Sequence, residues 1–143
     1  MNLSRRDLRI LLPLLAASKA RAQPEQPGRL PAKVYHNARI PYSGDAKKKG
    51  RAFFHGATHS GFNLEMHETV LGAGEATHAP HRHEHEEIVI VFGGTVEAWV
   101  EGRTELAEAG SVIYFASNQM HSARNAGKTP CRYYVIELRG SEA

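Results

Sequence analysis

The sequence predicts an all-β domain, either a sandwich or a jelly roll, from three observations. Short apolar runs separated by turns that contain glycine follow one another through most of the 143 residues. Gly93-Gly94 and Glu101-Gly102 stand where tight hairpin turns would be needed. Past residue 22, no stretch repeats its apolar residues with a convincing helical period. Many short strands at close, regular spacing are typical of two packed β-sheets.

Ten segments have the composition expected of strands: 34–40, 52–55, 62–71, 78–83, 86–92, 95–100, 104–106, 111–115, 121–125 and 132–138. The segment 88–92 is apolar at both alternating sets of positions, so both of its faces must be covered. One face can line the interior of the domain, whereas the other needs a second sheet or a second subunit. We therefore expect a homodimer.

The charge of the chain is unevenly distributed. Lysine and arginine number 18 against 15 acidic residues, a formal net charge of +3, but residues 1–22 alone contribute +4 and leave −1 for the rest. Neither nucleic-acid binding nor a membrane-surface role is therefore expected of the folded part. The basic run 47–51 could bind an anion. Because no aromatic residues or repeated basic stripe accompany it, we expect a solvated loop there.

The N-terminus resembles a twin-arginine signal peptide. Arg5-Arg6 is followed by an apolar stretch at 10–17 and by Ala20-Arg21-Ala22, a small-residue cleavage site. The apolar stretch is shorter than the roughly 20 residues of a membrane-spanning helix. We expect residues 1–22 to be a leader that directs the protein to the periplasm, with no stable membrane association once it is cleaved. An amphipathic helix retained in the mature protein is the alternative.

Residues 23–33 are rich in proline and predict an extended linker, which leaves 34–143 as a single domain. The one cysteine, Cys131, excludes a disulfide within the chain. A lone thiol in an oxidising compartment should be buried, and its strand-like surroundings favour burial over a catalytic role.

Histidine is the residue type that points to chemistry. His81 and His83 are two positions apart, so in an extended segment they project from the same face and can bind one ion together. Glu87 has the same parity and would add an anionic oxygen. Mixed nitrogen and oxygen ligands suit a divalent transition metal such as Fe, Mn, Ni, Zn or Cu, and disfavour Ca or Mg. Glu84 and Glu86 compete for the acidic position, although parity favours Glu87.

In these residues the sequence resembles the cupin superfamily, over roughly residues 74–125. The first cupin motif is a glycine, a spacer, His-x-His, three or four residues, a glutamate, six residues and a glycine. Gly74, His81-Arg82-His83, Glu87 and Gly94 match this pattern. The departure is one additional residue between Gly74 and His81, which a loop can absorb.

The second cupin motif is matched by Gly110, His121 and Asn125. Ala116 stands where the motif has proline, and Asn118 where it has glycine. Asparagine tolerates the left-handed conformation better than most residues, so the turn can be kept. The resemblance implies a cupin double-stranded β-helix, that is, a jelly-roll barrel, in which His81, His83, Glu87 and His121 hold one divalent metal ion.

Three further residues are candidates for catalytic roles. On the strand 62–71, the set at even positions is more apolar than the set at odd positions, which makes Glu68 the candidate pocket carboxylate. His85 could reach a substrate or shuttle a proton, or it could face solvent from a turn. His78 leaves the same choice open. Tyr133 is a candidate pocket tyrosine on the last strand, with structural packing as its alternative.

Two functions remain open on the sequence alone. A metal with three histidines and one glutamate keeps open positions for a small oxygenated metabolite. That arrangement suits an oxygenase, or a hydrolase or isomerase. The second is a non-catalytic module that binds a metal or a small ligand, which the short length of the domain favours. The fold by itself does not choose between them.

Overall fold

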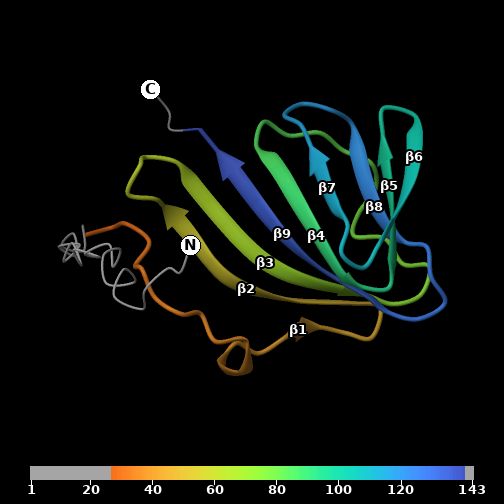
Figure 1. The fold of residues 1–143 in the computed structure, drawn as a ribbon, viewed down its shortest axis with the longest axis horizontal. Coiled ribbons are helices and arrows are strands. Elements are labelled where there is room, and N and C mark those ends of the chain that lie inside the picture. Colours follow the sequence, from red (N-terminus) through yellow and green to blue (C-terminus); the bar gives the residue numbers. More distant parts are fainter. Residues whose placement is uncertain (1–26, 141–143) are drawn as a thin grey trace, which may run out of the picture.

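The computed structural model describes residues 27–140, which form two antiparallel β-sheets packed face to face (Figure 1). Residues 1–22, where the sequence predicts a leader, lie outside the described part. The elements are a short 3-10 turn and nine strands: η1 (Asn37–Arg39), β1 (Ser43–Gly44), β2 (Lys48–Ala57), β3 (Asn63–Leu71), β4 (Glu86–Gly93), β5 (Thr95–Val100), β6 (Arg103–Glu108), β7 (Val112–Phe115), β8 (His121–Asn125) and β9 (Cys131–Arg139).

The larger sheet has the order β1-β2-β3-β9-β4-β7, and the smaller sheet has the order β6-β5-β8. Neighbours in the larger sheet come from distant parts of the sequence, since β9 lies between β3 and β4. The chain crosses between the sheets four times, after β4, β6, β7 and β8. This two-layer arrangement confirms the predicted jelly roll.

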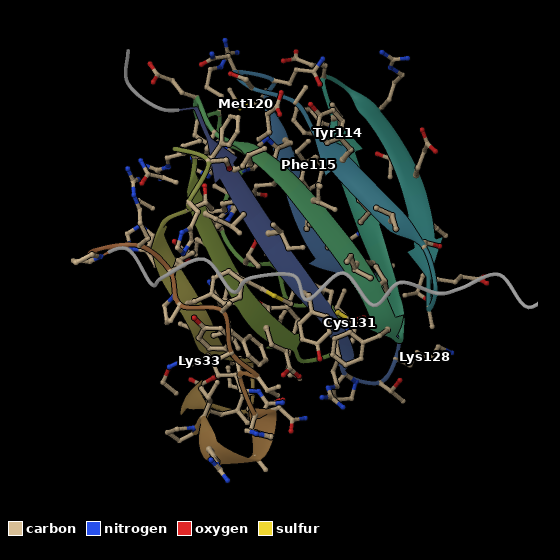
Figure 2. The ribbon with its side chains drawn as sticks, turned by 60° about the vertical axis from the view of Figure 1, so that its left-hand side comes forward. Lys33, Tyr114, Phe115, Met120, Lys128 and Cys131 are labelled. Atoms are coloured by element: carbon tan, nitrogen blue, oxygen red, sulfur yellow. The ribbon has the colours of Figure 1, made fainter. Side chains whose placement is uncertain are left out.

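The core lies between the two sheets and follows the alternation of each strand. On β4, Val89 and Val91 are buried, while Ile88 and its alternating partner Ile90 face the other side of the sheet. On β7, the neighbours Tyr114 and Phe115 (Figure 2) are 55% and 1% exposed. Burial of these apolar side chains supplies the main stabilisation of the domain. Cys131 is completely buried, as expected, and burial raises the pKa of its thiol.

The two glycine turns have different roles. Glu101 and Gly102 both have positive φ and close the β5–β6 hairpin, as predicted. Gly93-Gly94 does not close a hairpin, because β4 and β5 belong to different sheets. Gly94 has φ +75°, and a Cβ there would lie 2.8 Å from the backbone of Cys131. Only glycine fits this corner between the two sheets.

Three local expectations are wrong. Segment 34–40 contains η1 and no strand, because Arg39 and Ile40 donate backbone hydrogen bonds to nearby carbonyls. Segment 78–83 is a loop with a single bridge, His81 to His121. The basic run 47–51 is mostly strand, because β2 begins at Lys48 and pairs with β3. The segment 23–33, expected to be an extended linker, contacts the domain at Leu30, whose backbone N–H donates a hydrogen bond to the carbonyl of Ala57.

The outer face of the larger sheet carries a row of apolar side chains. Ile88, Val112, Tyr114 and Leu138 are each more than a third exposed there. No helix in the described part of the chain is long and apolar enough to cross a membrane.

Candidate metal centre

Both sheets contribute to the histidine cluster. His81 and His83 lie in the connection between β3 and β4, Glu87 is the second residue of β4, and His121 is the first residue of β8. The backbones of His81 and His121 exchange two hydrogen bonds, of 3.1 and 2.9 Å. This reciprocal pair holds the histidine loop against the smaller sheet.

A second backbone contact fixes His83. Its carbonyl accepts a 2.7 Å hydrogen bond from the backbone N–H of Asn118, which has the left-handed φ of 61° that the sequence predicts. The turn before β8 therefore supports the histidine loop directly. Asn125, at the end of β8, is fully buried, and its side-chain amide donates to the carbonyls of Leu71, Gly72 and Thr129. Its role is structural.

The imidazole rings are oriented by hydrogen bonds on one nitrogen only. Nδ1 of His83 lies 2.8 Å from the carbonyl of His85, and Nδ1 of His121 lies 2.8 Å from the carbonyl of Gln119. Each of these nitrogens must carry the proton, since a carbonyl only accepts. The buried Nε2 atoms of both rings have no hydrogen-bond partner, and neither has Nδ1 of His81. The hydrogen bonds on Nδ1 leave Nε2 of His83 and His121 as the nitrogen that each ring can offer to a metal.

The spacing of the donor atoms fits one transition-metal ion. One ring nitrogen from each of the three histidines lies within 4.8 Å of the other two. The Glu87 carboxylate lies 3.3 Å from Nε2 of His83 and 3.6 Å from Nε2 of His121. Two ligand atoms that are each about 2.1 Å from a tetrahedral ion are about 3.4 Å apart. Glu86, in contrast, pairs with Leu138 on the opposite face of the sheet.

The electrostatics of the cluster favour neutral histidine. Burial, followed by the neighbouring histidines, lowers the pKa of His81 below its ordinary value. A ring that stays unprotonated keeps its lone pair for a metal. An apolar wall completes the site, because the Phe115 ring stacks on His121 with centroids 4.3 Å apart.

His85 lies inside the site and does not face solvent. Its ring is parallel to that of His83 at a centroid distance of 3.5 Å. Its Nε2 atom lies 3.1 Å from the Glu137 carboxylate and 3.7 Å from that of Glu87. Burial, followed by the neighbouring His83, lowers the pKa of His85.

Tyr133 also lies in the interior, beside Thr69 in the pairing of β9 with β3. It is 1% exposed, and its hydroxyl has no hydrogen-bond partner. Burial raises the pKa of Tyr133 far above its ordinary value, so the hydroxyl stays protonated. It can donate a hydrogen bond to a ligand and cannot act as a base near neutral pH.

Glu68 lies at the edge of the cavity between the sheets, but the expectation that its carboxylate points into the interior is wrong. Glu68 pairs with Tyr134 on the outer face of the sheet, whereas Glu65, His67 and Thr69 take the inner positions. The Glu68 side chain is fully buried, and it accepts hydrogen bonds from Tyr42, Arg51 and Arg132. Burial opposes its ionisation, but these three donors outweigh burial and hold the pKa of Glu68 below its ordinary value. Apolar neighbours on its strand led the sequence analysis to the wrong face.

Three polar residues of the interior are not among the site residues predicted from the sequence. Glu65, His67 and Glu137 form a further cluster with one ligand atom each within 4.8 Å of the others. Glu137 lies between Glu65 on β3 and Glu87 on β4, and burial with these two carboxylates raises its pKa. The inward parity of Glu137 follows from that of Tyr133 on the same strand, a signal that the sequence does contain.

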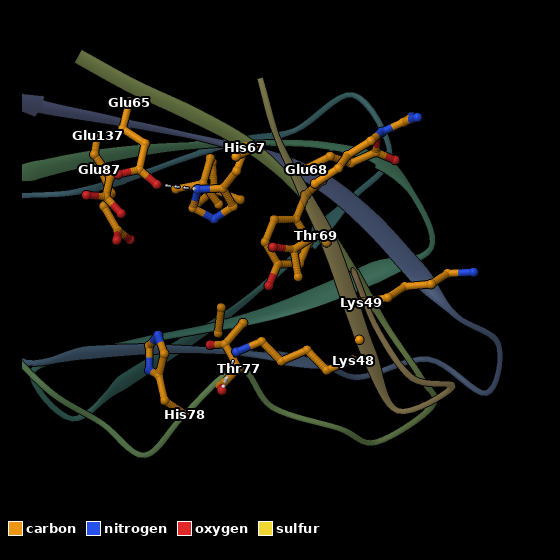
Figure 3. A pocket seen from close by; sticks show the side chains of 18 of the residues that line it. Lys48, Lys49, Glu65, His67, Glu68, Thr69, Thr77, His78, Glu87 and Glu137 are labelled. Carbon is orange, nitrogen blue, oxygen red and sulfur yellow. Dashed lines mark hydrogen bonds and ion pairs between the residues drawn. The ribbon is translucent and has the colours of Figure 1, made fainter. Parts of the chain in front are cut away.

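A cavity of about 660 Å³ opens between the sheets beside the histidines. Its lining includes His121 and Glu87 at the metal centre, and Thr69, Tyr133 and Val135 from the larger sheet. Figure 3 shows Glu65, Glu87 and Glu137 gathered on one side of this cavity, with His78 below them. The volume is in the usual range for small-molecule sites.

Comparisons with known proteins agree with this fold. Residues 67–137 match the family model described as a cupin domain. A search of curated proteins found no match. Many solved structures are similar, although at sequence identities that show the fold alone.

Three of these structures illustrate the likeness. A RmlC-like cupin from Shewanella frigidimarina NCIMB 400 is 17% identical with a TM-score of 0.61, over 75% of this chain and 90% of its own. The polyketide cyclase RemF from Streptomyces resistomycificus is 18% identical with a TM-score of 0.59, over 74% and 78%. A predicted oxalate decarboxylase from Thermotoga maritima is 18% identical with a TM-score of 0.60, over 74% and 98%. The protein therefore has the cupin jelly-roll fold, and residues 67–137 match the family model of the cupin domain.

Proposed function

We propose that His81, His83, His121 and Glu87 hold one divalent transition-metal ion, and that the protein is an enzyme that acts on a small oxygenated metabolite. The observation that carries this proposal is the set of buried, unpartnered ring nitrogens that converge beside one carboxylate. A buried polar group without a partner costs free energy, so its retention favours a ligand. The donor set suits Fe, Mn, Ni, Zn or Cu.

The bound ion would supply Lewis acidity, a water of lowered pKa or, if it is iron, oxygen chemistry. The chain supplies the surroundings. The Tyr133 hydroxyl is a hydrogen-bond donor for a ligand oxygen, because it is buried and without a partner. His85 lies between the carboxylates of Glu87 and Glu137, where it can pass a proton from one group to the other. Phe115 and Val135 give the cavity apolar walls.

Turnover with defined metals tests the proposal. The protein is stripped with a chelator, reloaded with iron, manganese, nickel or zinc, and assayed against 2-hydroxy acids, 2-keto acids, diols, catechols and acyl-ureido compounds. Oxygen uptake, hydrolysis or isomerisation that depends on one metal supports an enzyme. Ligand binding without turnover under all four metals would support the alternative, a non-catalytic cupin module that binds a metal or small molecule. We place the enzyme before the binding module because the similar structures include a polyketide cyclase and a predicted oxalate decarboxylase.

The protein is also proposed to form a homodimer through the outer face of the larger sheet. Val112 and Tyr114 are 63% and 55% exposed there, next to Ile88 and Leu138. Exposure of an apolar face of this kind to water is unfavourable, and pairing with the same face of a second copy removes that cost. Sedimentation equilibrium on wild type and Tyr114→Glu checks this, with a dimer expected for the first and a monomer for the second. A monomeric wild type would contradict it.

Export to the periplasm is proposed from the twin-arginine-type sequence at the N-terminus. The twin-arginine route transports folded proteins, which suits a protein that takes up its metal before export. Replacement of Arg5-Arg6 by Lys-Lys should retain the protein in the cytoplasmic fraction. An unchanged distribution between fractions would contradict the proposal.

A further inference from the structure

Negatively charged side chains gather on one side of the cavity beside the metal centre, and a lysine lies on another side. Glu65, Glu87 and Glu137 are direct neighbours across three strands and occupy one side. On another side, Lys48 extends from the start of β2 toward Thr77 and His78 (Figure 3). The walls between them include the small or apolar Ala52 and Val135 and the polar His67 and Thr69.

Three cationic residues line this cavity, and two of them are already engaged elsewhere. Arg51 forms an ion pair with the buried Glu68. Lys49 lies over the Tyr42 ring at 5.1 Å, and Figure 3 shows it pointing away from Lys48. Among the residues that the structure describes, no carboxylate lies within 4.0 Å of the Lys48 ammonium, although Lys47 beside it reaches Glu75.

The position of Lys48 relates it to the metal centre. Lys48 pairs with Leu71, a core residue, so its side chain is on the inner face of the sheet. Its ammonium donates one hydrogen bond, of 2.9 Å, to the carbonyl of Thr77. The next residue is His78, whose ring centroid lies 4.0 Å from that of His81. An ammonium has three donors, so two remain after the contact with Thr77.

We propose that Lys48 binds an oxyanion of the ligand, a carboxylate or phosphate, whose other end chelates the metal. The inference rests on the proposed metal site and names the class of ligand that it takes: a small organic acid with a chelating end, a short uncharged spacer and a terminal oxyanion. The row of glutamates repels that oxyanion and orients it toward Lys48. Lys48 is thus a specificity-determining residue.

A pair of probes that differ only at one end tests this. 2-Hydroxyglutarate and 2-hydroxyvalerate share the chelating 2-hydroxy acid and spacer, but the first ends in a carboxylate and the second in a methyl group. Each is titrated calorimetrically into zinc-loaded full-length protein. Wild type should bind 2-hydroxyglutarate about tenfold more tightly, as one charge-assisted contact allows. The phosphonate analogue, 2-hydroxy-4-phosphonobutanoate, shows which oxyanion is preferred, and tighter binding of either acid supports the proposal.

Lys48→Met should abolish the preference and leave the affinity for 2-hydroxyvalerate unchanged. Lys49→Met, one residue away and on the outer face, is the matched control and should keep the preference. Lys48→Gln, which keeps a donor for Thr77, should behave as Lys48→Met. Zinc content and thermal midpoint verify that each variant is folded.

Other outcomes overturn the inference in distinguishable ways. Equal affinities of wild type for the two probes would refute the role of Lys48 and leave the metal site intact. Equal weakening of both probes in Lys48→Met would show that the contact with Thr77 is only structural. If wild type holds one equivalent of zinc but binds none of the three acids, the inference fails and the metal site stands, whereas a protein that takes up no metal would refute the proposed function itself.

Discussion

The two faces of the larger sheet carry buried polar clusters that are built in opposite ways. On the outer face, the Glu68 carboxylate is fully buried and receives hydrogen bonds from Tyr42, Arg51 and Arg132. On the inner side, the metal centre leaves the Nε2 atoms of His83 and His121 without partners. Both clusters contain a carboxylate, and both lie in the larger sheet or against it.

The difference separates a structural cluster from a functional one. Where every donor and acceptor is satisfied within the chain, the polar groups hold the fold together and nothing remains for a ligand. The outer cluster also fastens the N-terminal segment, because Arg51 donates to the carbonyl of Asn37. Where buried lone pairs converge without partners, the fold carries the free-energy cost of burying them, and a bound ion would remove that cost. Substitutions should therefore affect stability on one face and binding on the other.

The largest effect on stability is expected for Glu68→Gln. Two arginines would lose their buried partner, and breaking a buried pair in this way typically costs about 3–5 kcal/mol. Urea denaturation of the metal-free protein measures the change. Glu97→Gln is the control, since Glu97 pairs with the half-exposed Arg124, and exposed pairs contribute less than about 1 kcal/mol. Similar losses for the two variants would contradict the account of the outer cluster.

The contribution of Glu68 should depend on pH in one direction. Its folded pKa lies below the ordinary glutamate value of 4.5, so folding favours the ionised form. The stabilisation is fully present above that value and is lost as the pH falls through the lower pKa of the folded state. The difference in unfolding free energy between wild type and Glu68→Gln should hence shrink below about pH 4.5. A difference that grows toward low pH would contradict the prediction.

Glu87→Gln should weaken metal binding less than any histidine substitution. The amide keeps an oxygen at the same place but loses its charge, and we expect an affinity lower by about 10- to 100-fold, the scale of single changes around metal sites. Competition with a chromophoric zinc chelator gives the affinity. Glu86→Gln, on the opposite face, is the matched control and should bind as wild type does. Reversed results would assign the acidic position to Glu86.

The smallest effect on stability is expected for Tyr133→Phe. Its buried hydroxyl has no partner, so its removal leaves no donor or acceptor unsatisfied, and the free energy of unfolding should change by less than about 0.5 kcal/mol. Ligand affinity in the zinc-loaded protein should fall nonetheless. A loss of stability with unchanged ligand affinity would place Tyr133 among the structural residues.

The parts of the fold that depend on local pattern could be predicted from the sequence. Alternation identified most strands, and the positive φ of Asn118 and Glu101-Gly102 followed from turn chemistry. The face occupied by Glu68 could not be predicted, because it depends on Arg51 and Arg132, which lie on two other strands. The composition of β3 alone indicated the wrong face for Glu68, because the pairing of β3 with its neighbouring strands determines that face.

The candidate site shows the same division. His81, His83 and Glu87 are close in the sequence, so their spacing alone indicated a common centre. The part of the site formed by Glu65, His67 and Glu137 requires the register between β3 and β9. That register joins segments far apart in the chain, and no short motif encodes it.

Metal content tests the central claim most directly. Elemental analysis of wild type, purified from its host or reloaded after chelation, should give about one equivalent of a single transition metal per chain. His83→Ala and His121→Ala should each lose it, while His59→Ala, with an exposed histidine outside the centre, should keep it. Circular dichroism verifies that all variants retain the β fold. A full equivalent of metal in both His83→Ala and His121→Ala would contradict the account.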